Sequence, residues 1–152
     1  FAWRASIATL AHDGDFSPFP GIDRIITLLD GGGVALYSDG ELRHQLQPNQ
    51  PFAFSGEEAI AARLAAGTSR DFNIMSRRES HSASAGITHK PFSPLPACAG
   101  VVYVLKGEWQ HPQARLATGQ GAWWESDDGS FTPHSPGALL LWGSIAAISH
   151  DL

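Results

Sequence analysis

An internal repeat limits the folds open to this chain more than any other feature of its sequence. IITLLDG at 25–31 matches VVYVLKG at 101–107, with apolar residues facing apolar residues and an identical glycine at the end. The second segment lies half a chain length after the first, in a chain of 152 residues. Self-similarity at a fixed spacing indicates one supersecondary unit used twice. The sequence therefore predicts two halves with the same fold.

Two further matches extend the repeat. AARLAAG at 61–67 matches GALLLWG at 137–143 with the same half-chain shift. PFAFSGEE at 51–58 matches GAWWESDD at 121–128 if the second half is six residues shorter in the loop before this segment and longer after it. The alignment sets three polar residues of the first half opposite small residues of the second: Arg70, Asp71 and Asn73 opposite Ala146, Ala147 and Ser149.

The stretch SRDFNIMSRR at 69–78 alternates as a strand does. Phe72 and Ile74 share one face, and Asp71, Asn73 and Met75 share the other. Such a charged strand is either an edge turned to water or the lining of a pocket for a charged ligand. Because the second half has mostly alanine at the aligned positions, we favour the pocket, and the charged edge stays open.

Short apolar runs separated by turn signals predict an all-β protein. The turns are GGG, SDG, PNQP, DDG and PHSPG, which interrupt strands at close spacing. EEAIAARLAAG at 57–67 has good helix propensity, but its repeat partner has the composition of a buried strand, so we predict a strand. The expected architecture is two antiparallel jelly-roll β-barrel halves, at 1–78 and 100–152, joined by a connecting segment at 79–99 into one compact unit.

Composition excludes several classes of function. The net charge of -5 argues against nucleic-acid binding. A single cysteine, Cys98, allows no internal disulfide, and no long apolar run or secretory signal is present, so we expect a cytoplasmic protein without membrane contact. Of the arginines, all but Arg115 lie at or before Arg78, which suggests that the two halves have different roles.

Arginines in the first half are candidates for binding an anion. The Pro20–Gly21 turn leads directly into the strand IITLL, so Arg24 stands at the mouth of that strand. A guanidinium there offers a planar fork that matches a carboxylate. Arg4, in the alternating stretch WRASIA, is a weaker candidate, because an exposed strand residue explains it equally well.

Metal and cofactor sites are not predicted. Jelly rolls of the cupin type often bind a metal through a His-X-His pair, but no two of the seven histidines here are separated by one residue. The chain also has no GxSxG, GxGxxG or P-loop motif. We therefore expect neither a metal ion nor a cofactor.

Four motifs in the first half resemble the HutD/Ves family of small bicupin proteins: WRASI, FSPFPGIDR, PFAFSGE and RDFNIMSRR. The second half is similar more loosely, through VVYVLKGEW and the adjacent pair Trp123–Trp124. The resemblance implies a metal-free bicupin, often encoded beside bacterial histidine-degradation enzymes and thought to restrain that pathway. No established catalytic activity comes with it, and the Ves branch is associated with cold stress instead. The ligand-binding residues that we expect are Arg4, Arg24, Asp71, Asn73, Met75, Arg77 and Arg78.

Together these features lead to a functional hypothesis. The protein is expected to be a non-catalytic regulator of histidine utilisation that senses a small anionic intermediate, such as urocanate or an N-formyl or N-formimino glutamate. One alternative is a metal-independent enzyme of the isomerase or epimerase type, which needs a His–carboxylate pair and a Tyr at the site. Another is a protein-interaction module, which needs Asp71 and Asn73 on a flat exposed surface. The sequence also leaves a homodimer open.

Overall fold

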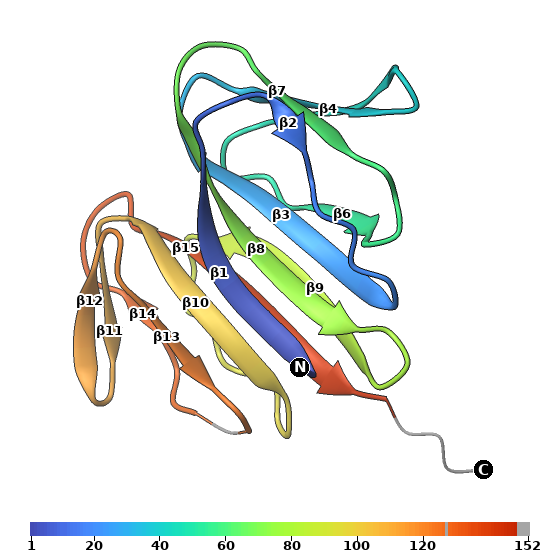
Figure 1. The fold of residues 1–152 in the computed structure, drawn as a ribbon. Coiled ribbons are helices and arrows are strands. Elements are labelled where there is room, and N and C mark those ends of the chain that lie inside the picture. Colours follow the sequence, from blue (N-terminus) through green and yellow to red (C-terminus); the bar gives the residue numbers. More distant parts are fainter. Residues whose placement is uncertain (127, 149–152) are drawn as a thin grey trace. The chain divides into compact units, whose positions relative to one another are not determined.

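The computed structural model describes residues 1–126 and 128–148, in which every regular element is a β-strand. The chain divides into two compact units, unit 1 at 1–82 and unit 2 from residue 83 onward. Figure 1 shows the strands of both units. The predicted all-β fold is thus confirmed, and the described residues contain no helix that could cross a membrane.

Unit 1 consists of two antiparallel sheets that share one hydrophobic core. The first has the order β1 (Trp3–Leu10), β8 (Ser69–Arg77), β3 (Ile22–Asp30), β6 (Phe52–Ser55). The second has the order β2 (Gly14–Asp15), β7 (Ala61–Leu64), β4 (Val34–Ser38), β5 (Glu41–Leu46). Apolar side chains of both sheets pack together in the core, including Ile26, Leu28, Val34, Leu36 and Phe54.

Unit 2 repeats this arrangement with a smaller second sheet. Its first sheet has the order β9 (His81–Thr88, of which the first two residues belong to unit 1), β15 (Leu139–Ala147), β10 (Ala99–Lys106), β13 (Gly121–Trp124). Its second sheet has the order β14 (Thr132–Pro133), β11 (Glu108–His111), β12 (Ala114–Ala117). Several aromatic side chains fill the core of this unit: Trp109, Trp124 and Phe131, with Phe92 and Trp142 packed against them.

The register of the strands confirms the predicted half-chain shift between β3 and β10. In each strand the pairing slips at one bulge, between Leu28 and Asp30 in β3 and between Val104 and Lys106 in β10. The identical glycines that follow, Gly31 and Gly107, have φ values of 114° and 73°. A Cβ atom at these glycines would lie 2.3 Å and 2.5 Å from serine Oγ atoms of Ser69 and Ser135, respectively. Only glycine tolerates both a positive φ and so close a neighbour, which explains why both halves have glycine at this position.

The match between β6 and β13 is also correct. Phe54 pairs with Arg24 in unit 1, and Trp124 pairs with Gly100 at the equivalent position of unit 2. The segment from Gly107 to Trp124 is six residues shorter than the segment from Gly31 to Phe54, as the alignment requires, and the difference lies in the region of β4 and β5 in unit 1 and of β11 and β12 in unit 2.

The third match, of AARLAAG with GALLLWG, is wrong. GALLLWG leads into β15, which holds the place of β8 in its sheet, whereas AARLAAG forms β7, whose counterpart is β14. Asp71 pairs with Leu28, and Leu140 pairs with Val104 at the equivalent position. Any buried strand has an apolar composition of this kind, so the sequence alone does not distinguish the two registers.

The corrected register changes the counterparts of the polar residues. The true counterparts of Asp71 and Asn73 are Leu140 and Trp142. Ala147, the counterpart expected for Asp71, lies farther along β15, and Ser149 lies outside the described residues. The contrast between the two units is therefore larger than the sequence alignment indicates, because apolar side chains replace a carboxylate and an amide.

Three local expectations have clear outcomes. The helix-like segment forms the strand β7, as predicted, because Ala62 and Leu64 pack into the core. β8 lies between β1 and β3, so the charged-edge explanation of its polar residues is wrong. The segment 79–99 contains the strand β9, where Gly86 lies against the indole ring of Trp142. The small side chains of β9 leave room for that ring. The prediction of a connecting segment at 79–99 did not include this strand.

Candidate functional site

Strand pairing brings five of the predicted site residues to one face of a sheet in unit 1. Asp71, Asn73 and Met75 alternate along β8 and share a face. Arg4 of β1 and Arg24 of β3 both pair with Met75, from opposite sides of β8. This face also carries Ile26 and Leu28, so it is the face that turns toward the core of unit 1.

Arg24, Asn73 and Asp71 form a buried chain of hydrogen bonds, which we call the polar network. The exposed fractions of these residues are 7%, 4% and 1%. Arg24 Nη2 donates to Asn73 Oδ1 at 3.1 Å, and Asn73 Nδ2 donates to Asp71 Oδ1. The amide of Asn73 therefore links the cation to the carboxylate, because its oxygen accepts from Arg24 and its nitrogen donates to Asp71.

Two polar atoms of the network remain without a hydrogen bond inside the described part of the chain. They are Arg24 Nε and Asp71 Oδ2, and both are fully buried. A buried donor or acceptor without a partner costs about 1–3 kcal/mol. Native proteins keep few such groups, so these two atoms call for an explanation other than stability.

Burial also changes the acidity of the network. Loss of hydration raises the pKa of Asp71 to about 6, although the hydrogen bond from Asn73 and the charge of Arg24 oppose that rise. Burial likewise lowers the pKa of Arg24, against the attraction of Asp71, and the charge of Arg4 lowers it further. The carboxyl group of Asp71 thus changes its protonation state near pH 6, well above the range usual for an aspartate.

Three phenylalanine rings surround the guanidinium of Arg24. Its Cζ atom lies 5.2 Å from the ring centre of Phe16, 5.3 Å from that of Phe19 and 4.9 Å from that of Phe54. Phe16 and Phe19 belong to the FSPFP segment, whose turn is closed by a hydrogen bond from the Ile22 N–H to the Phe19 carbonyl. The rings stabilise this largely buried cation by cation–π contacts.

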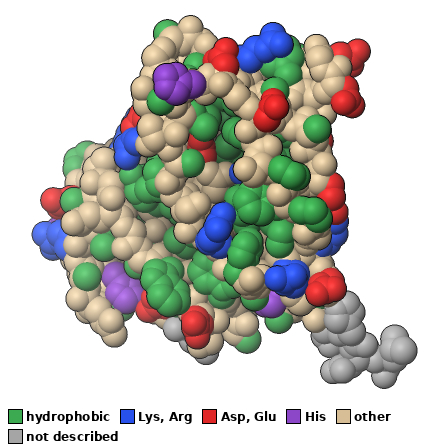
Figure 2. Space-filling view, viewed as in Figure 1, with side chains coloured by type: hydrophobic (Ala, Val, Ile, Leu, Met, Phe, Trp, Pro, Cys, Tyr) green, Lys and Arg blue, Asp and Glu red, His purple; other side chains and the backbone are tan. Residues whose placement is uncertain are grey.

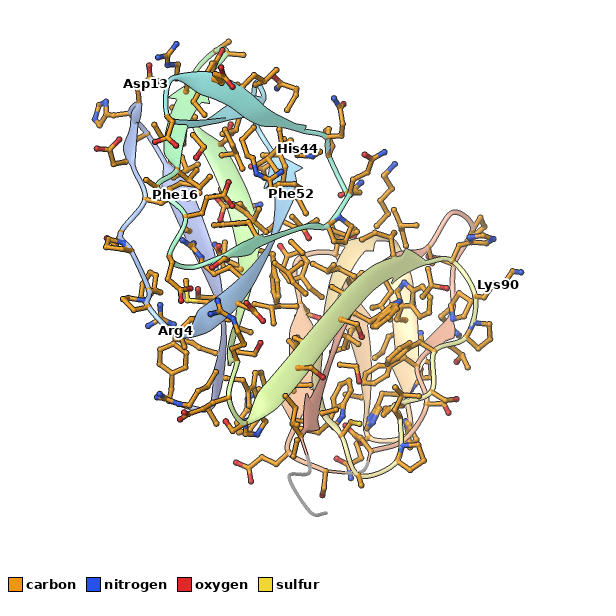
Figure 3. The ribbon with its side chains drawn as sticks, turned by 90° about the vertical axis from the view of Figure 1, so that its right-hand side faces the viewer. Arg4, Asp13, Phe16, His44, Phe52 and Lys90 are labelled. Atoms are coloured by element: carbon orange, nitrogen blue, oxygen red, sulfur yellow. The ribbon has the colours of Figure 1, made fainter. Side chains whose placement is uncertain are left out.

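A pocket of about 220 Å³ lies next to the polar network. Figure 3 shows Phe16 within unit 1 and Arg4 near the start of β3. The pocket is lined by side chains of β1, β3 and β8 and of the segment before β3: Ala8, Leu10, Asp15, Phe16, Ser17, Phe19, Arg24, Asp71 and Asn73. This volume is below the roughly 300–1,000 Å³ of most ligand pockets, so only a small molecule fits, with Arg24 to receive an anionic group and the carboxyl groups to receive a donor.

Arg4 and Met75 lie beside this pocket without lining it. Arg4 Nη2 is 3.6 Å from the Met75 sulfur, and its guanidinium lies 5.1 Å from the ring centre of Phe1 and 5.8 Å from that of Phe19. Arg4 therefore contacts Phe19, which is also a wall of the pocket.

The other two predicted residues lie elsewhere. Arg77 is exposed and donates to the carbonyl oxygen of Phe1. Arg78 donates to Asp23 at 2.8 Å and to both oxygens of Glu57, at 2.9 Å and 2.7 Å. The hydrogen bonds from Arg78 hold the pKa of Glu57 well below its usual value. Arg78 thus fastens the start of β3 to the turn after β6, and its polar hydrogens are already engaged there.

The sequence prediction did not identify which aromatic and small residues form the site. Phe16, Phe19 and Phe54 are not among the predicted ligand-binding residues, and neither are Asp15 and Ser17. Two phenylalanines that flank prolines in a turn were the available signal, because apolar rings in a turn need a partner to cover them.

A His–carboxylate pair occurs in unit 2, outside this pocket. His111 Nε2 lies 2.8 Å from Asp128 Oδ1, and His111 Nδ1 accepts the N–H of Gln113 at 3.2 Å. Asp128 Oδ1 also accepts the N–H of Gly129. Since both ring nitrogens are occupied, the pair holds a loop together and offers no free base.

No cluster of three or more metal-ligating side chains is found in residues 1–126 and 128–148. The equivalent of the polar network is also missing from the described strands of unit 2. Gly100, Leu140 and Trp142 stand where Arg24, Asp71 and Asn73 stand in unit 1. The rings of Trp124 and Trp142 fill that space instead.

Comparison with known proteins agrees with this architecture. A sequence model of the HutD family matches residues 1–141. Protein Ves of Cronobacter sakazakii (strain ATCC BAA-894) is 47% identical over 133 residues, which cover 87% of this chain and 72% of that protein. The structure of HutD from Pseudomonas fluorescens SBW25, in a formate condition, is 28% identical with a TM-score of 0.83, covering 98% of this chain and 81% of that one. A cupin 2 conserved barrel domain protein from Leptotrichia buccalis, at 9% identity and a TM-score of 0.65 over 97% of this chain and 84% of its own, shares the fold alone.

Proposed function

Because the chain belongs to the HutD family, we propose that it is a non-catalytic regulatory protein of histidine utilisation that binds a small anionic metabolite in unit 1. The ligand would be an intermediate such as urocanate or an N-formyl or N-formimino glutamate. The residues assigned to binding are those of the polar network, Arg24, Asn73 and Asp71, with phenylalanine rings as walls.

One observation carries this proposal. Two units of the same topology differ where β3 and β8 face the core: unit 1 buries Arg24, Asn73 and Asp71, and unit 2 has glycine, tryptophan and leucine there. The strands of unit 2 need no buried polar groups at these positions. The polar network therefore serves something other than the fold, and the pocket beside it offers the reason.

The chemistry of the pocket narrows the class of ligand. A carboxylate suits the guanidinium of Arg24 because charge-assisted hydrogen bonds are roughly twice as strong as neutral ones. Asp71, with its raised pKa, accepts an N–H group when ionised and donates a proton when neutral. A molecule with a carboxylate at one end and an N–H group at the other satisfies both, and the three named metabolites are of this kind.

The two alternative functions lack support at this site. A docking surface for a protein needs exposed polar residues, whereas Asp71 and Asn73 are buried. An epimerase needs a His–carboxylate pair and a tyrosine, but the residues that line the pocket include neither His nor Tyr.

Thermal-shift and calorimetric titration of the purified protein with urocanate, N-formylglutamate and N-formiminoglutamate tests the proposal. A ligand present at 100 times its Kd should raise the free energy of unfolding by roughly 2.7 kcal/mol. The Arg24→Lys variant keeps the charge but loses the planar fork, so its affinity for the same ligand should fall about 10-fold or more.

Arg77→Lys is the matched control, since it makes the same change at an exposed arginine in the same unit. It should bind like the parent protein. If no metabolite shifts the melting temperature, or if the two lysine variants bind equally well, the proposed function is wrong.

A further inference from the structure

A second pocket, in unit 2, has a basic and apolar lining. It has a volume of about 620 Å³ and lies between the end of β10, the turn after β9 and the loop that joins β14 to β15. Its lining includes three basic side chains and no acidic one: His89, Lys106 and His134. On a chain with a net charge of -5 this is an unusual local composition.

Comparison of the two units explains why Lys106 lacks a counter-ion. At the bulge of unit 1, Asp30 faces Arg70, and the two side chains form an ion pair with an N···O distance of 2.6 Å. At the equivalent bulge of unit 2, Lys106 faces Leu139. Among the described residues Lys106 makes no ion pair, so its ammonium group is free to bind an anion.

The loop from β14 to β15 supplies further donors. Ser135 Oγ accepts the N–H of Glu108 at 2.9 Å, which leaves the hydroxyl hydrogen of Ser135 to donate. Each imidazole, of His89 and His134, carries at least one N–H donor in any protonation state. Pro133, Pro136 and Leu139 form the apolar part of the same lining.

From these observations we propose that unit 2 has a second ligand site, which binds a small organic oxyanion, a carboxylate or a phosphate monoester, with a short apolar body. Lys106 pairs with the anionic group, and His89, His134 and Ser135 donate hydrogen bonds to its oxygens. The apolar body lies against the two prolines and Leu139. This site shares no residue with the pocket in unit 1 and does not depend on the function proposed for that pocket.

The test is an NMR titration of the full chain that follows the imidazole signals of His89 and His134. The probes are phenyl phosphate, benzoate and inorganic phosphate. Saturable shifts of both imidazoles with phenyl phosphate or benzoate are expected, and the tighter of the two probes identifies the anionic group. Inorganic phosphate should bind more weakly, because it lacks the apolar body.

Lys106→Gln should weaken binding by about 10-fold or more, the usual effect of losing a charge-assisted hydrogen bond. Lys90→Gln is the matched control, since Lys90 and Lys106 are the two lysines of the chain. Lys90 stands on the turn after β9 (Figure 3) and does not line the pocket. Its substitution should change the affinity by less than about 2-fold.

Leu139→Glu provides a second variant, because a carboxylate at this position restores the ion pair that unit 1 has at its bulge. It should abolish the shifts of both imidazoles. The proposal is wrong if phenyl phosphate and benzoate both leave the two imidazoles unmoved. It is equally wrong if Lys106→Gln binds as well as Lys90→Gln does. Arg24→Lys should leave this binding unchanged, so failure here is distinguishable from failure at the pocket in unit 1.

Discussion

Asp71 combines almost complete burial with a charge that its surroundings only partly neutralise. It accepts one hydrogen bond from Asn73, and its second oxygen has no partner in the described part of the chain. Its pKa of about 6 lies above the ordinary value of 3.8. The folded protein therefore binds a proton at Asp71 more tightly than the unfolded chain does.

The protonation of Asp71 leads to a prediction about stability. Proton binding by Asp71 stabilises the folded protein. This stabilisation is fully present below pH 3.8 and is lost as the pH rises toward 6. Asp71→Asn removes this dependence. The variant should therefore gain stability relative to the parent protein between about pH 4 and pH 6, by on the order of 3 kcal/mol. Urea denaturation across this pH range measures the difference.

Asp30→Asn is a control with the opposite sign. The hydrogen bond from Arg70 lowers the pKa of Asp30, so Asp30 stabilises the fold above its unfolded pKa and loses this effect as the pH falls. The free energy of unfolding of Asp30→Asn should lie below that of the parent protein by a constant amount near neutral pH, and this difference should shrink in acid. An Asp71→Asn difference that does not change between about pH 4 and pH 6 would show that Asp71 is not a buried, proton-binding group.

At the scale of elements, the bulged strand β3 positions the site. The bulge between Leu28 and Asp30 shifts the register at the end of β3, and Gly31 then turns the chain beside Ser69, at the start of β8. This contact fixes where β8 begins against β3. Since Asp71 and Asn73 lie two and four residues beyond Ser69, the same contact sets their position opposite β3.

Substitution of either bulge-turn glycine tests this role. Gly31→Ala and Gly107→Ala should each destabilise the protein by about 2–4 kcal/mol, because alanine is strained at a positive φ and its Cβ would overlap the serine beside it. Gly14→Ala is the control, since nothing lies within 4 Å of a Cβ at that glycine and its φ is not positive. Chemical denaturation should show little change for Gly14→Ala. Equal effects at all three glycines would contradict the role of the bulge turns.

The strands differed in how well the sequence predicted them. Alternation in SRDFNIMSRR correctly separated Asp71 and Asn73 from Phe72 and Ile74, because side chains in a strand point to opposite faces in turn. The glycine pair at 31 and 107 fixed the shift of β3 correctly, because it marks one strained position. GALLLWG carries no such mark, so its register was misassigned by seven residues. The Phe16 and Phe19 walls depend on how a loop folds over the sheet, which alternation does not reveal.

At the scale of the whole molecule, two units with the same topology differ in the side chains that they bury. Unit 2 buries indole and phenyl rings where unit 1 keeps a guanidinium, an amide and a carboxyl group. Charged side chains of both signs cover the end of unit 1 around β2, β4 and β7 (Figure 2), yet the polar network itself is withdrawn from that surface. A buried polar network is weaker support for a fold than apolar packing. Its presence in one unit is the reason why we propose a ligand site there.

The most direct test of this account follows the side chains of the polar network by ¹H–¹⁵N NMR, during titration with urocanate or an N-formyl or N-formimino glutamate. The signals to follow are the Arg24 Nε–H and the Asn73 side-chain amide. If unit 1 binds the metabolite through the network, both signals should shift saturably with the same Kd, while the exposed Arg77 Nε–H stays in place. If a metabolite binds and Arg24 and Asn73 do not respond, the polar network is not the binding site, and the central claim is wrong.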